Sequence, residues 1–290
     1  MVSRSDFDEL LDILELTPAG PDVFLGRHPR KNPVRTFGGQ LMAQAFVAAS
    51  RTLTESLPPS ALSVHFIAGG DPARDIEFTV VRLRDERRFA NRRVDATQDG
   101  KLLATALVSY LSGGTGIEHN FAMPEVPEPD GLPSIDALLV GYEEVVPLFV
   151  EAMRPIEWRY TNDPAWVMRE KGERLARNRV WMTARGDMPD DPVVHQAAMI
   201  YSSDTTVLDS IITTHGLSWG WDRIFAVTIN HSVWFHRPVD FSDWVLYSTA
   251  SPVAAESRGL AMGHFFNRNG QVVATVAQEG IVKHFPGAAR

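Results

Sequence analysis

The chain contains two copies of one sequence pattern, and an internal duplication constrains a fold more than any other sequence feature. The segment DGKLLATA at 99–106 resembles NGQVVATV at 269–276, an offset of 170 residues. Upstream of these, SVHF at 63–66 resembles SVWF at 232–235, at an offset of 169. Two blocks with nearly the same offset predict a duplicated unit of roughly 110–130 residues.

Each copy is expected to contain one long helix and several antiparallel strands. One helix is predicted from Phe37-Gly38-Gly39-Gln40 to about Leu53, and a second over 193–214. Alternating apolar residues between turn signals predict the strands. They are expected at 62–67, 76–84, 89–98, 102–111, 179–185, 224–235, 245–252, 260–267 and 272–283. This order is not a βαβ pattern, so it predicts an α+β fold rather than a doubly wound one.

A proline-rich segment separates the two copies. The stretch MPEVPEPDGLP at 123–133 is typical of an extended linker that runs over a surface. We therefore expect an N-terminal repeat over 1–115, a linker over 116–150 and a C-terminal repeat over 151–290.

Composition excludes several classes of function. The 36 acidic and 28 basic residues give a net charge of −8, which argues against a nucleic-acid partner. The absence of cysteine excludes disulfides, thiolate metal sites and a cysteine nucleophile. No apolar run is long enough for a membrane span, and 1–16 lacks the apolar core of a signal peptide. We expect a cytoplasmic protein without a metal or cofactor.

One acidic residue lies where the helix pattern predicts an apolar one. At ~100° per residue, Asp204 falls at the centre of an apolar face of the helix 193–214. The apolar members of that face are Ala197, Ile200, Tyr201, Val207, Leu208 and Ile211. A structural carboxylate with hydrogen-bond donors is one interpretation, and a functional acid is the other. If Gln40 is aligned with Gln196, Ala48 is the residue of the first copy that corresponds to Asp204. The repeated unit therefore does not require an acid at this position, which favours the functional interpretation.

Four motifs together resemble the acyl-CoA thioesterase II family, over about 24–283. They are RTFGGQ at 35–40, the linker at 123–133, HSVWFHRP at 231–238 and AQEG at 277–280. The resemblance implies a double hotdog fold, in which each repeat wraps an antiparallel sheet around a long helix. It also implies hydrolysis of fatty acyl-CoA to free acid and CoA, with acyl-CoA as the small-molecule partner.

The resemblance further implies a catalytic trio of Asp204, Thr228 and Gln278. Asp204 would act as general base on a water molecule, and the other two would hold that water or the base in line. Strand alternation places Gln278 on a mostly apolar face with Val276. Thr228 falls on the opposite face to Val233, so its assignment depends on the resemblance alone.

Other interpretations compete with this one. A hotdog hydratase or dehydratase, or a non-catalytic acyl-CoA binder, would share the fold. The GLSWG segment around Ser218 matches a nucleophile elbow, but a helix precedes it and a strand follows, which is the reverse of the required order. His231 and His236 are expected to be hydrogen-bonding or interface residues rather than metal ligands. The basic cluster Arg87, Arg88, Arg92 and Arg93 is either a solvated hairpin or a contact for CoA phosphates. We expect a homo-oligomer, because hotdog sheets commonly pair.

Overall fold

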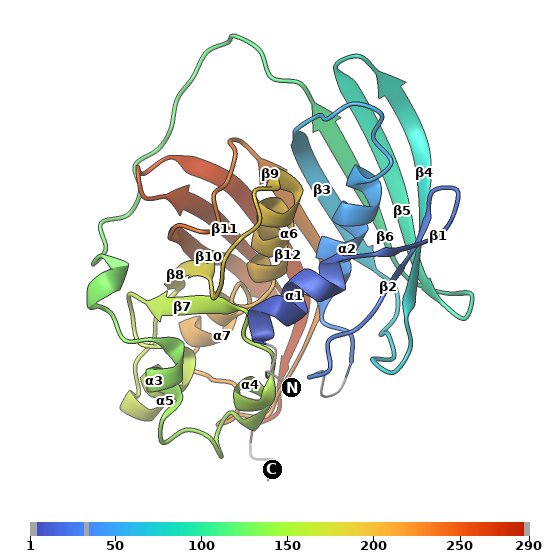
Figure 1. Ribbon diagram of the computed structural model, residues 1–290. Helices are drawn as coiled ribbons and strands as arrows, with labels where there is room; N and C mark the ends of the chain where they lie inside the picture. The colour runs from blue at the N-terminus through green and yellow to red at the C-terminus, as the bar shows by residue number, and fades with distance from the viewer. Residues whose placement is uncertain (1–4, 32–34, 287–290) are drawn as a thin grey trace.

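The computed structural model describes residues 5–31 and 35–286. Within these residues, twelve strands form one antiparallel sheet in the order β1-β2-β4-β5-β6-β3-β9-β12-β11-β10-β8-β7. Figure 1 shows that the sheet curves around the helices α2 and α6, one from each half of the chain. The two repeats therefore share a single sheet, in which β3 and β9 are the strands that meet.

The first repeat begins with a short helix and a hairpin before its central helix. Its elements are α1 (Asp6–Leu14), β1 (Thr17–Gly20), β2 (Val23–Gly26), α2 (Gly38–Ser50), β3 (Pro59–Phe66), β4 (Ile76–Glu86), β5 (Phe89–Gln98) and β6 (Lys101–Leu111). The four strands from β3 to β6 confirm the sequence prediction to within a few residues, whereas α1, β1 and β2 were not predicted. A tight turn at Asp99 (φ 48°) and Gly100 (φ 75°) joins β5 to β6, because both residue types tolerate positive φ.

The second repeat follows a connecting segment that contains three short helices. That segment holds η1 (Pro129–Gly131), α3 (Ile135–Leu139) and α4 (Pro147–Glu151). The repeat itself comprises β7 (Ile156–Tyr160), α5 (Ala165–Lys171), β8 (Arg177–Ala184), α6 (Pro192–Ser203), α7 (Asp209–Thr214), β9 (Ile224–Phe235), β10 (Val245–Ala255), β11 (Arg258–Asn267) and β12 (Val272–His284). The predicted strands are again confirmed, and β7 and α5 are additions.

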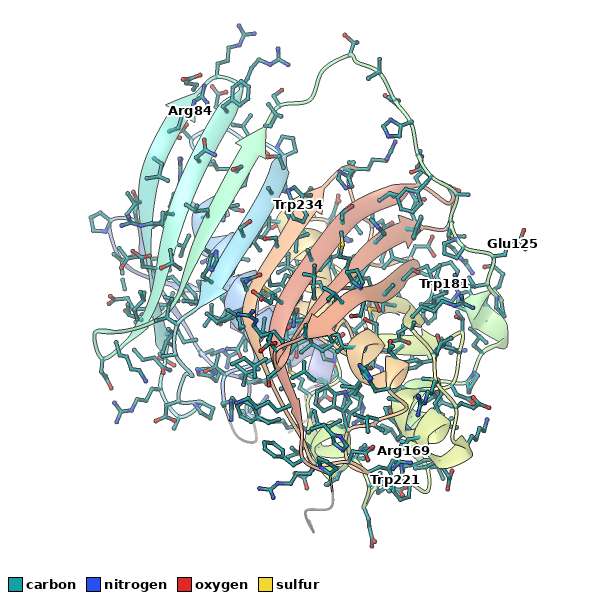
Figure 2. The ribbon with its side chains drawn as sticks, turned by 180° about the vertical axis from the view of Figure 1, so that it is seen from behind. Arg84, Glu125, Arg169, Trp181, Trp221 and Trp234 are labelled. Carbon is teal, nitrogen blue, oxygen red and sulfur yellow. The ribbon has the colours of Figure 1, made fainter. Side chains whose placement is uncertain are left out.

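The chain between β6 and η1 runs over the second repeat in extended form (Figure 1). Trp181 Nε1 donates to the carbonyl of Pro127 at 2.9 Å, and the backbone N–H of Val272 donates to Asn120 Oδ1 at 2.8 Å. Figure 2 shows Glu125 and Trp181 close together where this segment passes the edge strands. The extended path predicted for the proline-rich stretch is confirmed up to Glu128.

The predicted helix over 193–214 is wrong in one respect, because it is broken in the middle. α6 ends at Ser203, Asp204 is its C-cap, and α7 begins at Asp209. Side chains near the break bond backbone carbonyls: Ser202 Oγ donates to Ala198 O at 2.7 Å, and Thr205 Oγ1 donates to Ser202 O at 2.6 Å. Such bonds compete with the helical ladder, so a run of Ser and Thr can end a helix that apolar periodicity would continue.

Two buried helices and the β3–β9 pair hold the repeats together. Every residue of α2 from Gly39 to Ala49 is buried, as expected for a helix that is enclosed on all sides. At the sheet junction, Ser63 pairs with Ser232 and their hydroxyl oxygens lie 2.9 Å apart. Within the described residues no helix is both long and apolar enough to cross a bilayer.

Candidate active site

The start of α2 lies against the end of α6, and two glycines make this close approach possible. A Cβ on Gly39 would lie 2.4 Å from the carbonyl oxygen of Tyr201, and a Cβ on Gly38 would lie 2.6 Å from Asp204 Oδ2. The rings of Phe37 and Tyr201 pack edge to face beside them, with centroids 5.0 Å apart. The Gly-Gly pair predicted to open a helix therefore brings α2 into contact with the carboxyl group of Asp204.

The start of α2 has no side-chain cap. Its N-cap residue is Phe37, which makes no capping hydrogen bond, so the first N–H groups of α2 can donate to a group from another element. The backbone N–H of Gly39 donates to Asp204. A helix N-terminus carries partial positive charge and favours anions, so this end can stabilise a carboxylate or an oxyanion.

The structure brings Asp204, Thr228 and Gln278 together in one hydrogen-bonded chain. Gln278 Nε2 donates to Thr228 Oγ1 at 2.7 Å, and Thr228 Oγ1 donates to Asp204 Oδ1 at 3.4 Å. Gln278 is fully buried on β12, while Thr228 on β9 is partly buried. The three residues come from α6, β9 and β12, all of which belong to the second repeat.

A β-bulge in β9 turns Thr228 toward Asp204 and Gln278. Regular alternation along the strand had placed Thr228 on the face that points away from the helices. In the β9–β12 register, Gln278 pairs with His231 and Glu279 with Asn230, but Gly280 pairs with Thr228. One residue, Ile229, is thus inserted into β9. An inserted residue reverses the facing of everything beyond it, so Thr228 and His231 both face the helices.

Burial and hydrogen bonding have opposite effects on the pKa of Asp204. Burial raises the pKa of Asp204 to about 7, and it outweighs the hydrogen bonds from Gln278, the Gly39 N–H and Thr228, which lower it. A carboxyl group with a pKa near neutrality can accept a proton from water and return it, as a general base requires.

Two residues of the same chain were not predicted as part of the site. His231 Nδ1 hydrogen bonds Gln278 Oε1, and His231 Nε2 lies 2.9 Å from Ser203 Oγ. Both Ser203 and His231 are fully buried. The prediction that His231 is a hydrogen-bonding residue is confirmed, but the sequence gives no signal for its partners, and Ser203 is one of many polar residues on its helix.

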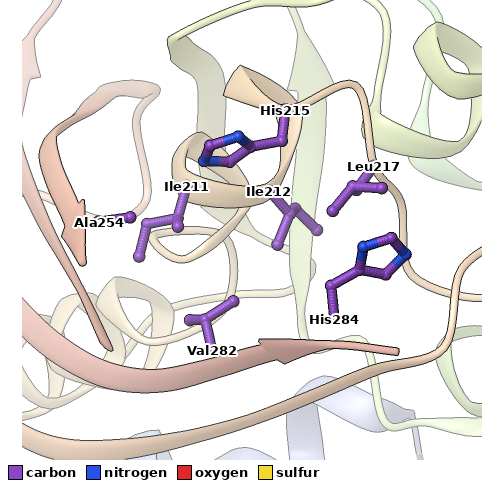
Figure 3. A pocket seen from close by; sticks show the side chains of 7 residues that line it. All are labelled: Ile211, Ile212, His215, Leu217, Ala254, Val282 and His284. Atoms are coloured by element: carbon purple, nitrogen blue, oxygen red, sulfur yellow. The ribbon is translucent and has the colours of Figure 1, made fainter. Parts of the chain in front are cut away.

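An apolar pocket of about 370 Å3 lies beyond Gln278 along β12, between α7 and the ends of β10 and β12. Its lining is shown in Figure 3 and consists of Ile211, Ile212, His215, Leu217, Ala254, Val282 and His284. Gln278, Gly280 and Val282 alternate with outward residues, so they share the face that points at the helices. Leu208 fills the space over Gly280, with side-chain atoms 3.3–3.4 Å from where a Cβ would be. The pocket and the Asp204 chain are thus neighbours on one strand.

Two other sequence candidates do not belong to this site. Ser218 is fully buried in the turn between α7 and β9, where its hydroxyl donates to the carbonyl of Trp219. Arg92 is fully buried and bonded to Thr52 and Asp85, so it is not available as part of a basic surface cluster. Figure 2 shows Arg84 at the tip of the β4–β5 hairpin, where Arg87 and Arg88 also lie.

Comparisons with known proteins cover nearly the whole chain. A family model described as acyl-CoA thioesterase matches 149–281, and one described as acyl-CoA thioesterase N-terminal domain matches 27–111. Human acyl-coenzyme A thioesterase 8 is 32% identical over 94% of this chain and 88% of its own length. Acyl-CoA thioesterase 2 of Haemophilus influenzae is 30% identical over 95% of this chain and 97% of its own length.

Solved structures with the same fold include bacterial thioesterases. The tesB protein of Mycobacterium avium subsp. paratuberculosis has a TM-score of 0.78 and 32% identity, over 96% of this chain and all of its own. Acyl-CoA thioesterase II TesB2 of Mycobacterium marinum has a TM-score of 0.78 and 29% identity, over 97% and 99% of the two chains. A protein from Alicyclobacillus acidocaldarius described as having a hot dog fold matches at a TM-score of 0.78 and 21% identity, over 97% and 99% of the chains.

Proposed function

The chain belongs to the acyl-CoA thioesterase family and has its double hotdog fold, and from this premise we propose that it hydrolyses acyl-CoA thioesters with a water molecule activated by Asp204. The observation that carries the proposal is the buried carboxyl group of Asp204, which lies against the start of α2 and is hydrogen bonded to Thr228 and the N–H of Gly39. The activity itself is acyl-CoA thioester hydrolysis, as in its relatives.

The reaction requires no covalent intermediate. The oxygen of water bonds to the thioester carbonyl carbon while Asp204 takes up the proton of that water. The C–S bond then breaks, and the CoA thiolate leaves with the proton from Asp204. Because a thiol has a pKa of about 8.5 and leaves readily, no strong acid is needed. Thr228 and Gln278 hold the carboxyl group in one orientation, and a correctly oriented base lowers the activation barrier.

The start of α2 is the best candidate for the oxyanion site. The tetrahedral intermediate carries its negative charge on the former carbonyl oxygen. The N–H groups at the start of α2 lie beside Asp204, and that of Gly39 donates to its carboxyl group; the partial positive charge of this helix start would also stabilise that oxygen. The first repeat would thus supply the oxyanion donors and the second repeat the base.

We propose the apolar pocket beyond Gly280 as the place for the acyl chain, because it continues from Gln278 along the same face of β12. Ala254→Trp would narrow the pocket, whereas Val253→Trp would add the same ring on the opposite face of β10. We expect only Ala254→Trp to shift the preference toward shorter acyl chains, measured as kcat/KM across a chain-length series. Equal effects of both variants would contradict this assignment.

Self-association, domain division and location are further proposals. A row of small and apolar side chains crosses the outer face of the sheet along paired positions: Leu107, Ser63, Ser232, Ala277 and Met262. Such a face supports a homo-oligomer, which light scattering would detect.

We propose that the N-terminal repeat spans 1–115, the linker 116–150 and the C-terminal repeat 151–290. Residues 1–4, 32–34 and 287–290 lie outside the described residues. A cytoplasmic location stays a prediction.

Thiol release from acyl-CoAs of several chain lengths tests the proposed chemistry. We expect the wild-type chain to release CoA, and Asp204→Asn to lower kcat by ~10²–10⁴-fold, the usual contribution of a general base. Asp209→Asn is the matched control. Asp209 is also buried with a pKa raised by burial to about 7, but it accepts from Trp219 Nε1 at 2.6 Å, outside the Asp204 chain.

Three outcomes would contradict the proposal. Full activity of Asp204→Asn would exclude Asp204 as the base. A covalent acyl adduct on the protein, detected by mass spectrometry after rapid quenching, would exclude direct attack by water. Tight acyl-CoA binding without thiol release would favour a binding protein, and water addition to an enoyl-CoA would favour a hydratase.

A further inference from the structure

A buried chain of five polar side chains crosses the second repeat. It runs from Ser203 on α6 to His231 on β9, then to Gln278 on β12, back to Thr228 on β9 and finally to Asp204. Ser203, His231 and Gln278 are fully buried. The proposed mechanism uses only the last three members, so the other two need an explanation.

Counting hydrogens gives this chain one direction. Burial lowers the pKa of His231 to about 4, so its ring is neutral near pH 7 and carries a single N–H. Gln278 Nε2 donates to Thr228 Oγ1, so Gln278 Oε1 is the atom that faces His231. An amide oxygen can only accept, so the ring hydrogen is on Nδ1 and Nε2 is left as an acceptor. Ser203 Oγ lies 2.9 Å from Nε2 and 2.7 Å from the carbonyl oxygen of Ile200, and it shares its one hydrogen between these two acceptors. Gln278 then turns its amide nitrogen toward Thr228, whose own hydrogen is left for Asp204.

The opposite orientation of the Gln278 amide would break the chain at its functional end. The amide oxygen would face Thr228 and attract its only hydroxyl hydrogen. Asp204 would lose that donor. The orientation of Gln278 therefore decides whether Asp204 is held, and the Nδ1–H of His231 selects the orientation that holds it.

The first repeat shows that the fold does not need these polar groups. Its equivalent of the His231–Gln278 pair is Leu62 paired with Val108, at the same cross-strand register and equally buried. The alignment of the two helices that makes Ala48 equivalent to Asp204 also makes Val47 equivalent to Ser203. Val47 and Ala48 are both buried in α2. Because a buried polar group that loses its partner costs about 1–3 kcal/mol, an amide and an imidazole in this place point to a task other than packing.

We infer that His231, itself oriented by Ser203, is a positioning residue of the catalytic site that fixes the amide of Gln278 and, through Thr228, the carboxylate of Asp204. This inference rests on the proposed function, since it assigns the residues behind the proposed base. His231 does not contact the substrate and does not transfer a proton.

The inference predicts a change in the pH profile as well as in the rate. The bonds from Thr228 and Gln278 lower the pKa of Asp204, so a variant that loosens them should raise the apparent pKa of kcat/KM. Among the described residues, the titratable groups that interact with Asp204 are Tyr201 on α6 and Tyr247 on β10, whose pKa values are both raised by burial. α2 contributes only backbone N–H groups and the glycines, so neither neighbour produces a competing titration near pH 7.

His231→Leu, which copies Leu62, is the main test, with acyl-CoA as substrate. We expect kcat to fall ~10–100-fold, as for a misplaced catalytic group, with KM changed less than twofold and the pH profile moved upward. His231→Asn should recover part of the rate, because its side-chain N–H can donate to Gln278. Ser203→Ala, a smaller change, should give a weaker effect in the same direction. His236→Leu is the control, since His236 bonds Thr275 away from the chain.

A double-mutant cycle separates positioning from general packing. If His231 acts through Thr228, then His231→Leu should cost little more when Thr228 is already Ala. Circular dichroism and Tm measurements test whether each variant is folded. If His231→Leu does not fold, Ser203→Ala takes its place in the cycle. A folded His231→Leu with wild-type kcat and pH profile overturns the inference, as do additive effects in the cycle. Failure of the proposed function would look different, because Asp204→Asn would then be fully active.

Discussion

The two repeats have the same architecture but opposite chemistry around their central helices. α2 is an unbroken helix of 13 residues, and four positions of the proposed catalytic chain, Ser203, Asp204, His231 and Gln278, have apolar equivalents in the first repeat, namely Val47, Ala48, Leu62 and Val108. In the second repeat the helix is broken at Asp204, and the equivalent positions carry a hydroxyl, a carboxyl, an imidazole and an amide.

The helix starts differ in the opposite sense. α2 begins without a cap from its own N-cap residue. At the start of α6, the N-cap residue Asp191 accepts from the N–H of Val193 at 2.9 Å, and Pro192 is the first helical residue. An acidic cap occupies donors that an oxyanion would need. The first repeat therefore has a helix start without a cap of its own and no acid at Ala48, while the second repeat has the acid and a helix start capped by Asp191.

Copying the first repeat into the second at Gln278 should have the largest effect. Gln278→Val reproduces Val108, removes the donor to Thr228 and leaves His231 without its acceptor. We expect kcat for acyl-CoA to fall ~10²-fold, since the base loses its orientation. The control is Val276→Ile, a buried apolar change on the same face of β12. Unchanged kcat in folded Gln278→Val would show that the amide is only structural.

Removing the contribution of the first repeat should have a smaller effect. A Cβ at position 38 would lie 2.6 Å from Asp204 Oδ2, so Gly38→Ala pushes the carboxyl group away from the helix start. We expect about a tenfold loss of kcat. Gly69→Ala, whose Cβ would have nothing within 4 Å, should leave kcat unchanged. Equal activities would mean that α2 contributes nothing to the reaction.

The smallest expected effect is on stability, and it tests whether the acids in the second repeat are costly. Folding raises the pKa of Asp204 from 3.8 to about 7, so the native state binds a proton more tightly than the unfolded chain. The free energy of unfolding therefore falls as pH rises from about 4 to about 7. Asp204→Asn removes this penalty and should raise Tm by ~2–4 °C at pH 8, but not at pH 4.

Asp209→Asn should show the same trend, because burial raises the pKa of Asp209 in the same way. The two variants would then differ only in activity. A lower Tm of Asp204→Asn at pH 8 would indicate that the ionised carboxylate is net stabilising in its hydrogen-bonded setting.

Much of the fold follows from local sequence signals. The Asp99-Gly100 turn, the alternating strands and the repeat are features of short segments, and the structure reproduces them. Asp204 and Gln278 were visible because each is a polar residue in an apolar stripe. The helix α1 was not predicted although its sequence carries the signals, a Ser5–Asp8 capping box and buried apolar residues Phe7, Leu10, Ile13 and Leu14 on one face. The strands β1 and β2 have only four residues each, which is too short for a clear alternation.

The rest of the site depends on two irregularities that periodicity does not encode. The break after Ser203 and the bulge at Ile229 each shift the facing of the residues that follow. Thr228 therefore joins the chain although alternation placed it on the other face. The hydrogen bonding of His231 was predicted but its place in the site was not, because its partners lie on two other elements and one strand pattern does not reveal them.

The continuous sheet across Ser63 and Ser232 also fixes a stoichiometry. In a dimer of identical hotdog chains, every substitution would appear at both symmetry-related sites, so an acid gained at one would be gained at the other. Joining two units in one polypeptide lets the two sites diverge. At the equivalent positions the start of α6 is capped by Asp191 and Ala48 stands in place of the acid, so we expect no second reaction site among the described residues. Each chain should accordingly turn over a single acyl-CoA at a time, whatever the number of chains that assemble.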